Sequence, residues 1–339
     1  MSTTSERLTF HTGAAVPVLP HDAKRPVWLK ARRHGIGGSD IAAIVGLSRW
    51  SSPYQVWLDK TGRSDEIPDN PSMRWGRAVE PVLRSWFAEQ TGIEVAPTGM
   101  WRSVEHPLAL ANPDGLTGDD GGLECKAHGW RMADEWDDDQ VSDAAELQAQ
   151  WYAGVLGLDH WWVIAKVGDD EPLIRRVDAD PALFATLLEA AERFWTDYVE
   201  ADREPGFAAL DLPVVKERYR TVELDTTEAP DPQRVRLLLA ERAAAKDAEK
   251  DSAANAARAE AELLAILGNA EALTIDGAVV LTAKANGTFA PTRLAADHPD
   301  VAEAFTTTRT VLDVDRLKTE RADLYQAYRA RVLRPTKEK

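Results

Sequence analysis

The chain of 339 residues has a single cysteine, Cys125. Disulfides, cysteine cages for zinc and iron–sulfur clusters all need several thiolates, so the sequence excludes them within one chain. Long apolar runs are also missing. No segment approaches the ~20 apolar residues of a membrane-spanning helix, and the polar stretch up to Thr12 lacks the apolar core of a signal peptide. We therefore expect a cytoplasmic protein without membrane association, in which any metal is bound by oxygen.

Basic residues are in the minority, with 40 Lys and Arg against 56 Asp and Glu and a formal net charge of -16. Because phosphate groups are bound mainly by Lys and Arg, this balance argues against a protein that coats nucleic acid nonspecifically. Contact with DNA would have to follow a local basic path, and carboxylates that hold cations would add to the negative charge. The 44% hydrophobic content suffices for one large core with an appendage.

Composition and periodicity divide the chain into four segments. These are a loosely ordered lead over 1–27, a main domain over 28–205, a linker with a long helix over 206–268, and a small unit over 269–339. The patterns predict helices over 73–90, 142–156, 181–199 and 232–267, strands over 123–126 and 161–167, an N-cap at Ser72, a helix end at Gly92 and a hairpin turn at Asp276-Gly277. The expected architecture is therefore α/β with a C-terminal extension.

Two acids and a lysine stand close together in the sequence. Asp114 follows a short predicted strand, and Glu124 and Lys126 lie on the next one. Because side chains alternate across a strand, Glu124 and Lys126 share one face, while Leu123 and Cys125 share the other. A strand-turn-strand hairpin would bring Asp114 and Glu124 together.

This combination suits phosphodiester hydrolysis with Mg²⁺. A carboxylate-bound Mg²⁺ positions a water, stabilises the charge that develops on phosphorus and assists the leaving oxygen. The main-chain carbonyl of Cys125 is a further candidate ligand, and the Lys126 ammonium is a candidate for orienting the water or neutralising charge. Glu-x-Lys by itself is common on exposed strands, so the interpretation depends on the surrounding residues.

The acidic pair belongs to one of four separated sequence blocks. They are residues 28–46, which contain Arg32 and Gly-Gly-Ser-Asp; residues 73–81, Met-Arg-Trp-Gly-Arg-Ala-Val-Glu-Pro; Asn-Pro-Asp-Gly at 112–115 with Leu-Glu-Cys-Lys at 123–126; and residues 146–158, which contain Gln-Ala-Gln. In this order the blocks resemble the PD-(D/E)xK nuclease superfamily and, within it, the YqaJ-type viral recombinases related to lambda exonuclease. Two positions depart from the family pattern: Trp151 stands where His is frequent, and Ala127 where Thr is common.

The resemblance implies a fold and an activity. The fold would be α/β, a restriction-endonuclease-like core with a mixed central sheet flanked by helices, extended by a long helix and a small α+β unit. The activity would be a DNA exonuclease of a phage or prophage recombination system, working 5′ to 3′ on duplex ends with Mg²⁺ or Mn²⁺. Expected partners are double-stranded DNA ends, a RecT-type single-strand annealing protein and further copies of the chain in a homo-oligomer. The alternatives are an endonuclease with the same core and a noncatalytic phage protein that binds DNA or a partner.

The resemblance also implies roles at the site. The catalytic set is Asp114, Glu124, Lys126, Glu80 and Gln148, of which Asp114, Glu124 and Glu80 would bind metal together with the Cys125 carbonyl. Gln148 and Gln150 lie two apart on one predicted helix, so at most one faces the site, and we favour Gln148. Glu80 has an ordinary alternative as a helix acid paired with Arg77 or Arg84.

A second implied role concerns the DNA end. Arg32 would bind the terminal 5′ phosphate, and Ser39, with Gly37 and Gly38, would contact the same anion at a helix N-terminus. The ordinary alternative for Gly-Gly-Ser-Asp is an N-cap, because Ser and Asp are favoured there. Capping and phosphate binding are compatible.

Overall fold

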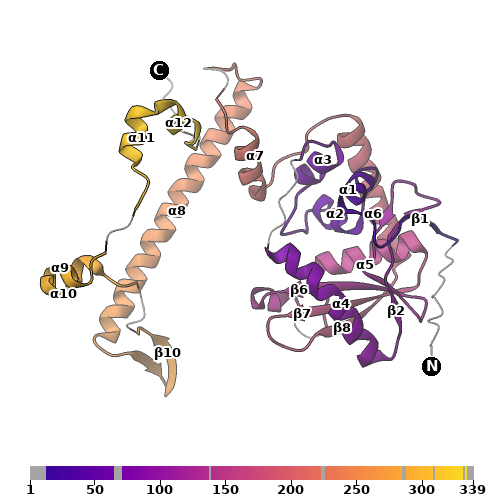
Figure 1. Ribbon diagram of the computed structural model, residues 1–339, viewed down its shortest axis with the longest axis horizontal. Coiled ribbons are helices and arrows are strands. Elements are labelled where there is room, and N and C mark those ends of the chain that lie inside the picture. The colour runs from indigo at the N-terminus through magenta and orange to yellow at the C-terminus, as the bar shows by residue number, and fades with distance from the viewer. Residues whose placement is uncertain are drawn as a thin grey trace. The chain divides into compact units, whose positions relative to one another are not determined.

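The computed structural model describes residues 13–64, 71–136, 139–222, 226–284, 288–307, 310–330 and 333. The chain forms two compact units, Met1–Glu217 and Arg218–Lys339. Figure 1 shows the elements of both units in chain order. Among the described residues, no helix combines the length and the apolar character needed to cross a membrane.

A five-stranded sheet forms the centre of the first unit. Its strand order is β2 (Val95–Ala96), β5 (Gly115–Thr117), β6 (Gly122–His128), β7 (His160–Val167) and β8 (Leu173–Asp178). The pair β6 and β7 is parallel, and all other pairs in this sheet are antiparallel. Because parallel neighbours need a crossover, the chain passes through helix α5 (Asp143–Leu156) between them. The sheet is therefore mixed, as predicted.

Helices cover both faces of this sheet (Figure 1). On one face α4 (Pro71–Thr91) buries Leu83 and Phe87 against Leu123 and Ile164. On the other face α5 packs within the larger core, which includes Trp161 and Val163 of β7. Alternation along the strands sends neighbouring side chains to opposite faces, so Glu124 and Lys126 are directed toward α5. The predicted fold class is confirmed.

A smaller sheet and several helices complete the first unit. The sheet has the order β1 (Ala15–Leu19), β3 (Met100–Ser103) and β4 (Leu110–Ala111), all antiparallel. The helices are α1 (Arg25–Arg32), α2 (Gly38–Ile44), α3 (Pro53–Lys60) and α6 (Pro181–Phe194), with the shorter turns η1 (Trp130–Glu135), η2 (Trp195–Glu200), η3 (Ala209–Asp211) and α7 (Leu212–Arg218). Together they surround the face of the central sheet that carries α5.

Several sequence expectations need correction. The lead over 1–27 is not loosely ordered throughout, because β1 pairs with β3 in an edge position that tolerates Pro17; residues 1–12 lie outside the described residues. The partner of β6 in the predicted hairpin is the three-residue β5 rather than the strand before Asp114. Helix α4 begins at Pro71, so Ser72 is not its N-cap. Trp75 on this helix is 63% exposed, although its place in the apolar pattern of 73–90 favours the core.

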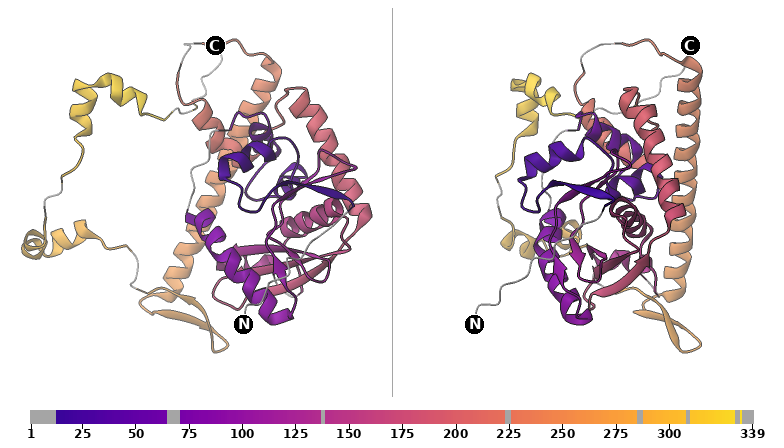
Figure 2. Two further views of the ribbon diagram at one scale, coloured as in Figure 1. Left: turned by 45° about the vertical axis from the view of Figure 1, so that its right-hand side comes forward. Right: turned by 90° about the vertical axis from the view of Figure 1, so that its right-hand side faces the viewer.

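The second unit is built around one long helix, α8 (Pro232–Leu267), which is continuous in both views of Figure 2. The Asp231 side chain accepts a hydrogen bond from the Arg234 N–H at 2.9 Å and so caps its start, as predicted. A hairpin follows, β9 (Ala272–Ile275) and β10 (Ala278–Thr282), whose turn residues Asp276 and Gly277 have φ of 51° and 83°. The remaining helices are α9 (Pro291–Asp297), α10 (Pro299–Ala304), α11 (Val314–Glu320) and α12 (Ala322–Ala327).

Candidate functional site

Asp114 lies in the turn directly before β5, and Glu124 lies on the neighbouring strand β6. The main-chain N–H of Cys125 donates a hydrogen bond to Asp114 Oδ2 at 2.7 Å. This contact fixes the Asp114 carboxylate beside the strand that carries Glu124. Leu123 and Cys125 pack toward α4, and the Glu124 side chain is buried on the opposite face at 4% exposure. The two predicted acids are therefore brought together, by β5 and β6.

Lys126 connects this acidic pair to helix α5. Its Nζ donates to Glu124 Oε1 and to Gln148 Oε1, both at 2.7 Å. Gln148 Nε2 in turn donates to the hydroxyl of Tyr152 at 3.2 Å, one helical turn further along α5. Gln150 faces elsewhere and binds the main chain of Asp178 and Asp180. We call Asp114, Glu124, Lys126 and Gln148 the acidic site.

The acidic site holds its carboxylates in an unfavourable electrostatic state. Burial and the neighbouring carboxylates of Glu124 and Glu80 raise the pKa of Asp114 well above its ordinary value. Burial also raises the pKa of Glu124, although Lys126 acts in the opposite direction. Glu124 Oε2 is buried and has no hydrogen-bond partner among the described residues. The negative charge of the pair is thus only partly compensated by Lys126.

Glu80 stands at the margin of this site on α4. It forms an ion pair with Arg84, one turn along the same helix, which agrees with the ordinary alternative for a helix acid. Arg84 Nη1 also donates to the main-chain carbonyl of Asp114 at 2.9 Å. Arg84 therefore ties α4 to the turn that carries Asp114, and Glu80 is engaged by a cation of the protein itself.

The donor atoms of the acidic site suit a hard divalent cation. In the part of the chain that the structure describes, no three His, Cys, Asp or Glu side chains form a group that could hold a metal. Asp114 and Glu124 nevertheless present carboxylate oxygens, the donors that Mg²⁺ and Mn²⁺ prefer. The orphaned Glu124 Oε2 is a buried anionic atom of the kind that a cation would satisfy. Burial raises the pKa of the Cys125 thiol, so a thiolate is not part of this donor set.

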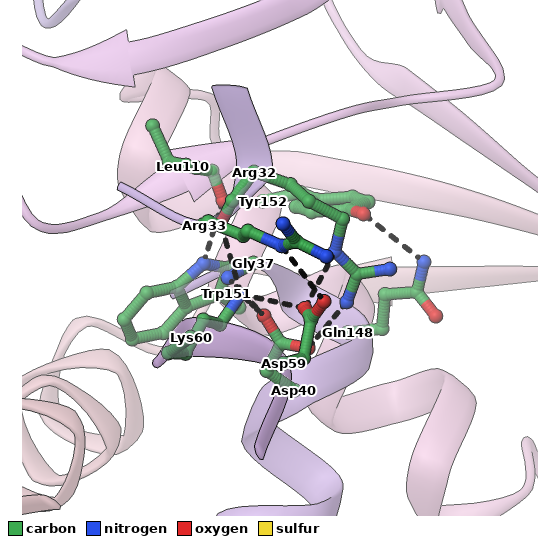
Figure 3. A network of polar contacts seen from close by, with 10 residues as sticks. All are labelled: Arg32, Arg33, Gly37, Asp40, Asp59, Lys60, Leu110, Gln148, Trp151 and Tyr152. Carbon is green, nitrogen blue, oxygen red and sulfur yellow. Dashed lines mark hydrogen bonds and ion pairs between the residues drawn. The ribbon is translucent and has the colours of Figure 1, made fainter. Parts of the chain in front are cut away.

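A second polar cluster lies beside Gln148 and Tyr152 (Figure 3). Arg32 Nη2 donates to Asp40 Oδ1 at 2.7 Å, and Arg32 Nε is 3.4 Å from Asp59 Oδ2. Lys60 Nζ donates to Asp40 Oδ2 at 2.6 Å, and Arg33 Nε is 3.7 Å from Asp59 Oδ1. We call these five residues the Arg32 cluster. Arg32 is thus paired with carboxylates of its own chain.

The carboxylate of Asp40 is fully compensated. Burial alone would raise the pKa of Asp40, but the adjacent Lys60 and Arg32 lower it to about 2. Burial lowers the pKa of Lys60 despite the proximity of Asp40. The pKa of Arg32 is raised, because Asp40 and Asp59 outweigh the effect of burial. The carboxylates of the cluster are therefore balanced by cationic side chains of the cluster itself.

The Gly-Gly-Ser-Asp segment forms the start of α2. Gly37 is the N-cap, and its N–H donates to Asp40 Oδ2 at 2.9 Å. The cap acid is thus Asp40, at the third helical position, and Ser39 is an exposed residue within the first turn. Ser39 lies seven positions after Arg32 on a neighbouring helix. Neither Ser39 nor Asp40 is therefore the N-cap, and Asp40 supports the helix start from the third helical position by binding the N–H of Gly37.

Close packing joins the acidic site to the Arg32 cluster. A Cβ added to Gly38 would lie 2.7 Å from Tyr152 Cε1 and 2.8 Å from Gln148 Cγ, so only glycine allows α2 to approach α5 this closely. The indole N–H of Trp28 donates to Asn112 Oδ1 at 2.9 Å, two residues before Asp114. The guanidinium of Arg32 lies over the Trp28 ring, 5.1 Å from its centroid. The two groups of charged residues form one continuous polar region.

Comparison with known proteins places the chain in a family. The family model described as "YqaJ-like viral recombinase domain" matches residues 27–159. The Bacillus subtilis (strain 168) protein named "Uncharacterized protein YqaJ" is 31% identical over 221 residues, which cover 62% of this chain and 67% of that protein. This chain belongs to the YqaJ-like viral recombinase domain family. The matched segment includes the acidic site and the Arg32 cluster.

Three solved structures with a partial likeness to this YqaJ-family chain have the word exonuclease in their names or belong to such a protein. An alkaline exonuclease from Laribacter hongkongensis is 21% identical with a TM-score of 0.43, and the overlap covers 57% of this chain and 99% of that one. The structure of the same protein in complex with dAMP is 22% identical with a TM-score of 0.44, and the overlap again covers 57% of this chain and 99% of that one. A phage related exonuclease from Haemophilus somnus 129PT is 12% identical with a TM-score of 0.37, and the overlap covers 50% of this chain and 96% of that one.

Sequence reasoning missed four residues of this YqaJ-family site. Tyr152 follows Gln148 by four positions, a helical spacing that could have revealed their contact. Arg84 was considered only as a partner of Glu80, and its bond to the Asp114 carbonyl spans 30 residues. Asp40 was treated as a general capping candidate. Lys60 is separated from Asp40 by 20 residues, and no local sequence pattern predicts their pairing.

Proposed function

We propose that this YqaJ-family chain is a metal-dependent DNA exonuclease that degrades one strand of duplex DNA from its end, 5′ to 3′. Membership of the family supports a nuclease. The observation that carries the proposal is the acidic site, in which Asp114 and Glu124 lie together with their charge only partly compensated by Lys126. Carboxylates in this state are suited to a divalent cation, and a divalent cation is suited to phosphodiester hydrolysis.

The proposed metal ligands are Asp114, Glu124 and the Cys125 carbonyl, with Glu80 as a ligand only after it leaves Arg84. A bound Mg²⁺ or Mn²⁺ would supply a polarised water and charge stabilisation at the phosphorus. Lys126 holds Glu124 Oε1, and the other carboxylate oxygen makes no hydrogen bond to any residue that the structure describes. Its ammonium, fixed by Gln148, can orient an incoming water or neutralise developing charge.

We propose further that the Arg32 cluster binds the 5′ phosphate at the DNA end. Arg32 lies near Tyr152 and Gln148 (Figure 3), of which Gln148 belongs to the acidic site, and its side chain is 26% exposed. The exposed Ser39 is proposed as a second phosphate contact at the start of α2. A guanidinium that keeps part of its hydrogen-bonding edge free is well suited to a terminal phosphate.

The wider setting that we propose is a phage or prophage recombination system in the host cytoplasm. The exposed strand would pass to a RecT-type annealing protein, and the nuclease would act as a homo-oligomer on double-stranded DNA ends.

The deciding experiment compares four DNA substrates under two metal conditions. Linear duplexes with 5′ phosphate, 5′ hydroxyl or blocked ends, and covalently closed circles, are incubated with Mg²⁺ or with EDTA. We expect degradation of linear DNA with Mg²⁺, a preference for 5′ phosphate and intact circles. Cut circles would identify an endonuclease instead. DNA binding without cleavage under any divalent metal would identify a noncatalytic protein.

A further inference from the structure

We infer that Lys60 is a positioning residue for the Arg32 cluster: by engaging one oxygen of Asp40, it leaves Arg32 a free guanidinium edge with which to select a 5′-phosphorylated DNA end. The inference rests on the proposed function, because it concerns how Arg32 meets its phosphate. It assigns a role to a lysine that touches neither the acidic site nor solvent.

Lys60 is enclosed completely, with 0% of its side chain exposed. Burying an ammonium is costly unless the charge is paired and its protons are bonded. Its Nζ donates to Asp40 Oδ2 at 2.6 Å and to the main-chain carbonyl of Arg32 at 2.9 Å. Arg32 ends α1, where helix carbonyls lack partners within the helix. Lys60 therefore holds the residue that carries the guanidinium and the acid that faces it.

The two oxygens of Asp40 are divided between the two cations. Oδ1 accepts from Arg32 Nη2 at 2.7 Å, while Oδ2 accepts from Lys60 and from the Gly37 N–H. An arginine facing an otherwise unengaged carboxylate tends to bind both oxygens in a paired geometry. With Oδ2 occupied by Lys60, Asp40 binds Arg32 through one nitrogen only. Lys60 thereby prevents a closed pair between Asp40 and Arg32.

The remaining donors of Arg32 are available. In the described parts of the chain, the polar contacts of Arg32 run through Nη2 to Asp40 and through Nε to Asp59, and its side chain is 26% exposed. Asp59 is only a loose partner, because its Oδ2 is 3.4 Å from Arg32 Nε and makes no hydrogen bond to a described residue. Nη1 is thus the donor left for a further anion on a guanidinium whose position is fixed by Asp40.

Charge balance supports the same role. The cluster contains the cations of Arg32, Arg33 and Lys60 and the carboxylates of Asp40 and Asp59, which leaves an excess of positive charge. Without Lys60 the cluster would be neutral, and Asp40 could use both oxygens on Arg32. A terminal phosphate would then compete with a stronger internal pair. Loss of Lys60 is therefore expected to weaken phosphate recognition without altering the acidic site.

The test measures kcat and KM of the full-length protein on linear duplexes that carry either 5′ phosphate or 5′ hydroxyl. For Lys60→Met we expect KM for the phosphorylated end to rise about tenfold, the equivalent of one charge-assisted hydrogen bond. The kcat on both substrates and KM for the hydroxyl end should stay within about twofold. Leu187→Ala, in the core at α6, is the matched control for lost stability and should leave the ratio of the two KM values unchanged.

Two further variants separate the possible outcomes. Arg32→Gln should abolish the phosphate preference; if it does not, the proposed recognition of the DNA end by Arg32 is wrong. If Arg32→Gln abolishes the preference but folded Lys60→Met retains it, the positioning role of Lys60 is overturned. Should Lys60→Met not fold, Asp59→Asn decides, because removing this carboxylate raises the excess charge and should lower KM for the phosphorylated end. An unchanged or higher KM would contradict the inference.

Discussion

Asp40 and Asp114 lie in neighbouring parts of the same polar region but in opposite electrostatic states. Lys60 and Arg32 lower the pKa of Asp40 to about 2, against the effect of burial. Burial and the carboxylates of Glu124 and Glu80 raise the pKa of Asp114 well above its ordinary value. Asp40 is buried and Asp114 is half-buried, and burial raises the pKa of both, so the opposite direction of the two shifts comes from their neighbours. One aspartate is surrounded by cations of the chain, and the other by acids.

This difference distinguishes a structural acid from an acid of the proposed binding site. A compensated acid such as Asp40 stabilises the folded chain and holds Arg32 in place. An acid that repels its neighbours costs stability, and such clusters are retained where they bind or react with something else. The orphaned Glu124 Oε2 belongs to the second kind. Burial of Asp114 and Glu124 thus costs stability, whereas the compensated Asp40 contributes some.

The largest expected effect follows from removing a charge at the acidic site. Asp114→Asn and Glu124→Gln keep the side-chain volume but lose an anionic oxygen for the metal. We expect each to lower the single-turnover rate on linear duplex DNA at least ~100-fold, the scale found for loss of an electrostatic group at a reacting centre. Binding of DNA in EDTA, measured by fluorescence anisotropy, should change little. Rates near that of the parent chain would remove these residues from the catalytic set.

The next effect contrasts the two aspartates directly in the metal-free protein. Asp40→Asn leaves Lys60 buried with a broken ion pair, and such losses cost about 3 kcal/mol or more. Asp114→Asn removes a repelled charge and should leave the free energy of unfolding unchanged or raise it. Urea denaturation of both variants at neutral pH, in EDTA, measures the difference. Equal destabilisation by the two substitutions would contradict the assignment of opposite states.

Much of this contrast could be predicted from local patterns, and part of it could not. Alternation along 123–126 correctly gave Glu124 and Lys126 one face, and helical spacing correctly separated Gln148 from Gln150. The periodic helices and the strand over 161–167 were also predicted, because long amphipathic or apolar segments carry a strong signal. Asp114 was predicted beside Glu124, although through the wrong strand pair.

What escaped prediction depends on contacts between distant segments. Strand β5 has three residues and no alternation to recognise. Strand β1 contains Pro17, which local rules count against a strand. The pairing of Lys60 with Asp40 joins α3 to α2 in the folded chain, and a lysine at a helix end is ordinarily solvated. Such residues become identifiable only when burial and partner are known together.

A moderate effect is expected at the glycine that joins the two regions. In Gly38→Ala the new Cβ would meet Tyr152 and Gln148 within 3 Å, so these side chains or the helices must shift. Overpacking of this kind costs about 1–3 kcal/mol. Because Gln148 fixes Lys126, we also expect slower cleavage of both phosphorylated and hydroxyl ends, measured under saturating DNA. Gly129→Ala is the control, since nothing lies within 4 Å of its added Cβ.

The smallest effect is a difference in the pH dependence of stability. Groups whose pKa is raised on folding, here Asp114 and Glu124, contribute stability below their unfolded pKa values of about 3.9 and 4.3. This contribution is lost as pH rises through the raised folded values. Asp40, with its pKa lowered to about 2, behaves in the opposite way and loses its contribution only as pH falls below about 4.

In EDTA, the parent chain should therefore lose stability relative to Asp114→Asn as pH rises from about 4 toward neutrality. Thermal unfolding of the two proteins across this range gives the difference curve. Mg²⁺ added at neutral pH should raise the Tm of the parent and leave that of Asp114→Asn nearly unchanged, because the cation replaces the repulsion between the two acids with attraction. If the Tm values of the two proteins differ by the same amount at every pH, with and without Mg²⁺, the charge of Asp114 is balanced by neighbouring cations, as that of Asp40 is, and the assignment of opposite states is wrong.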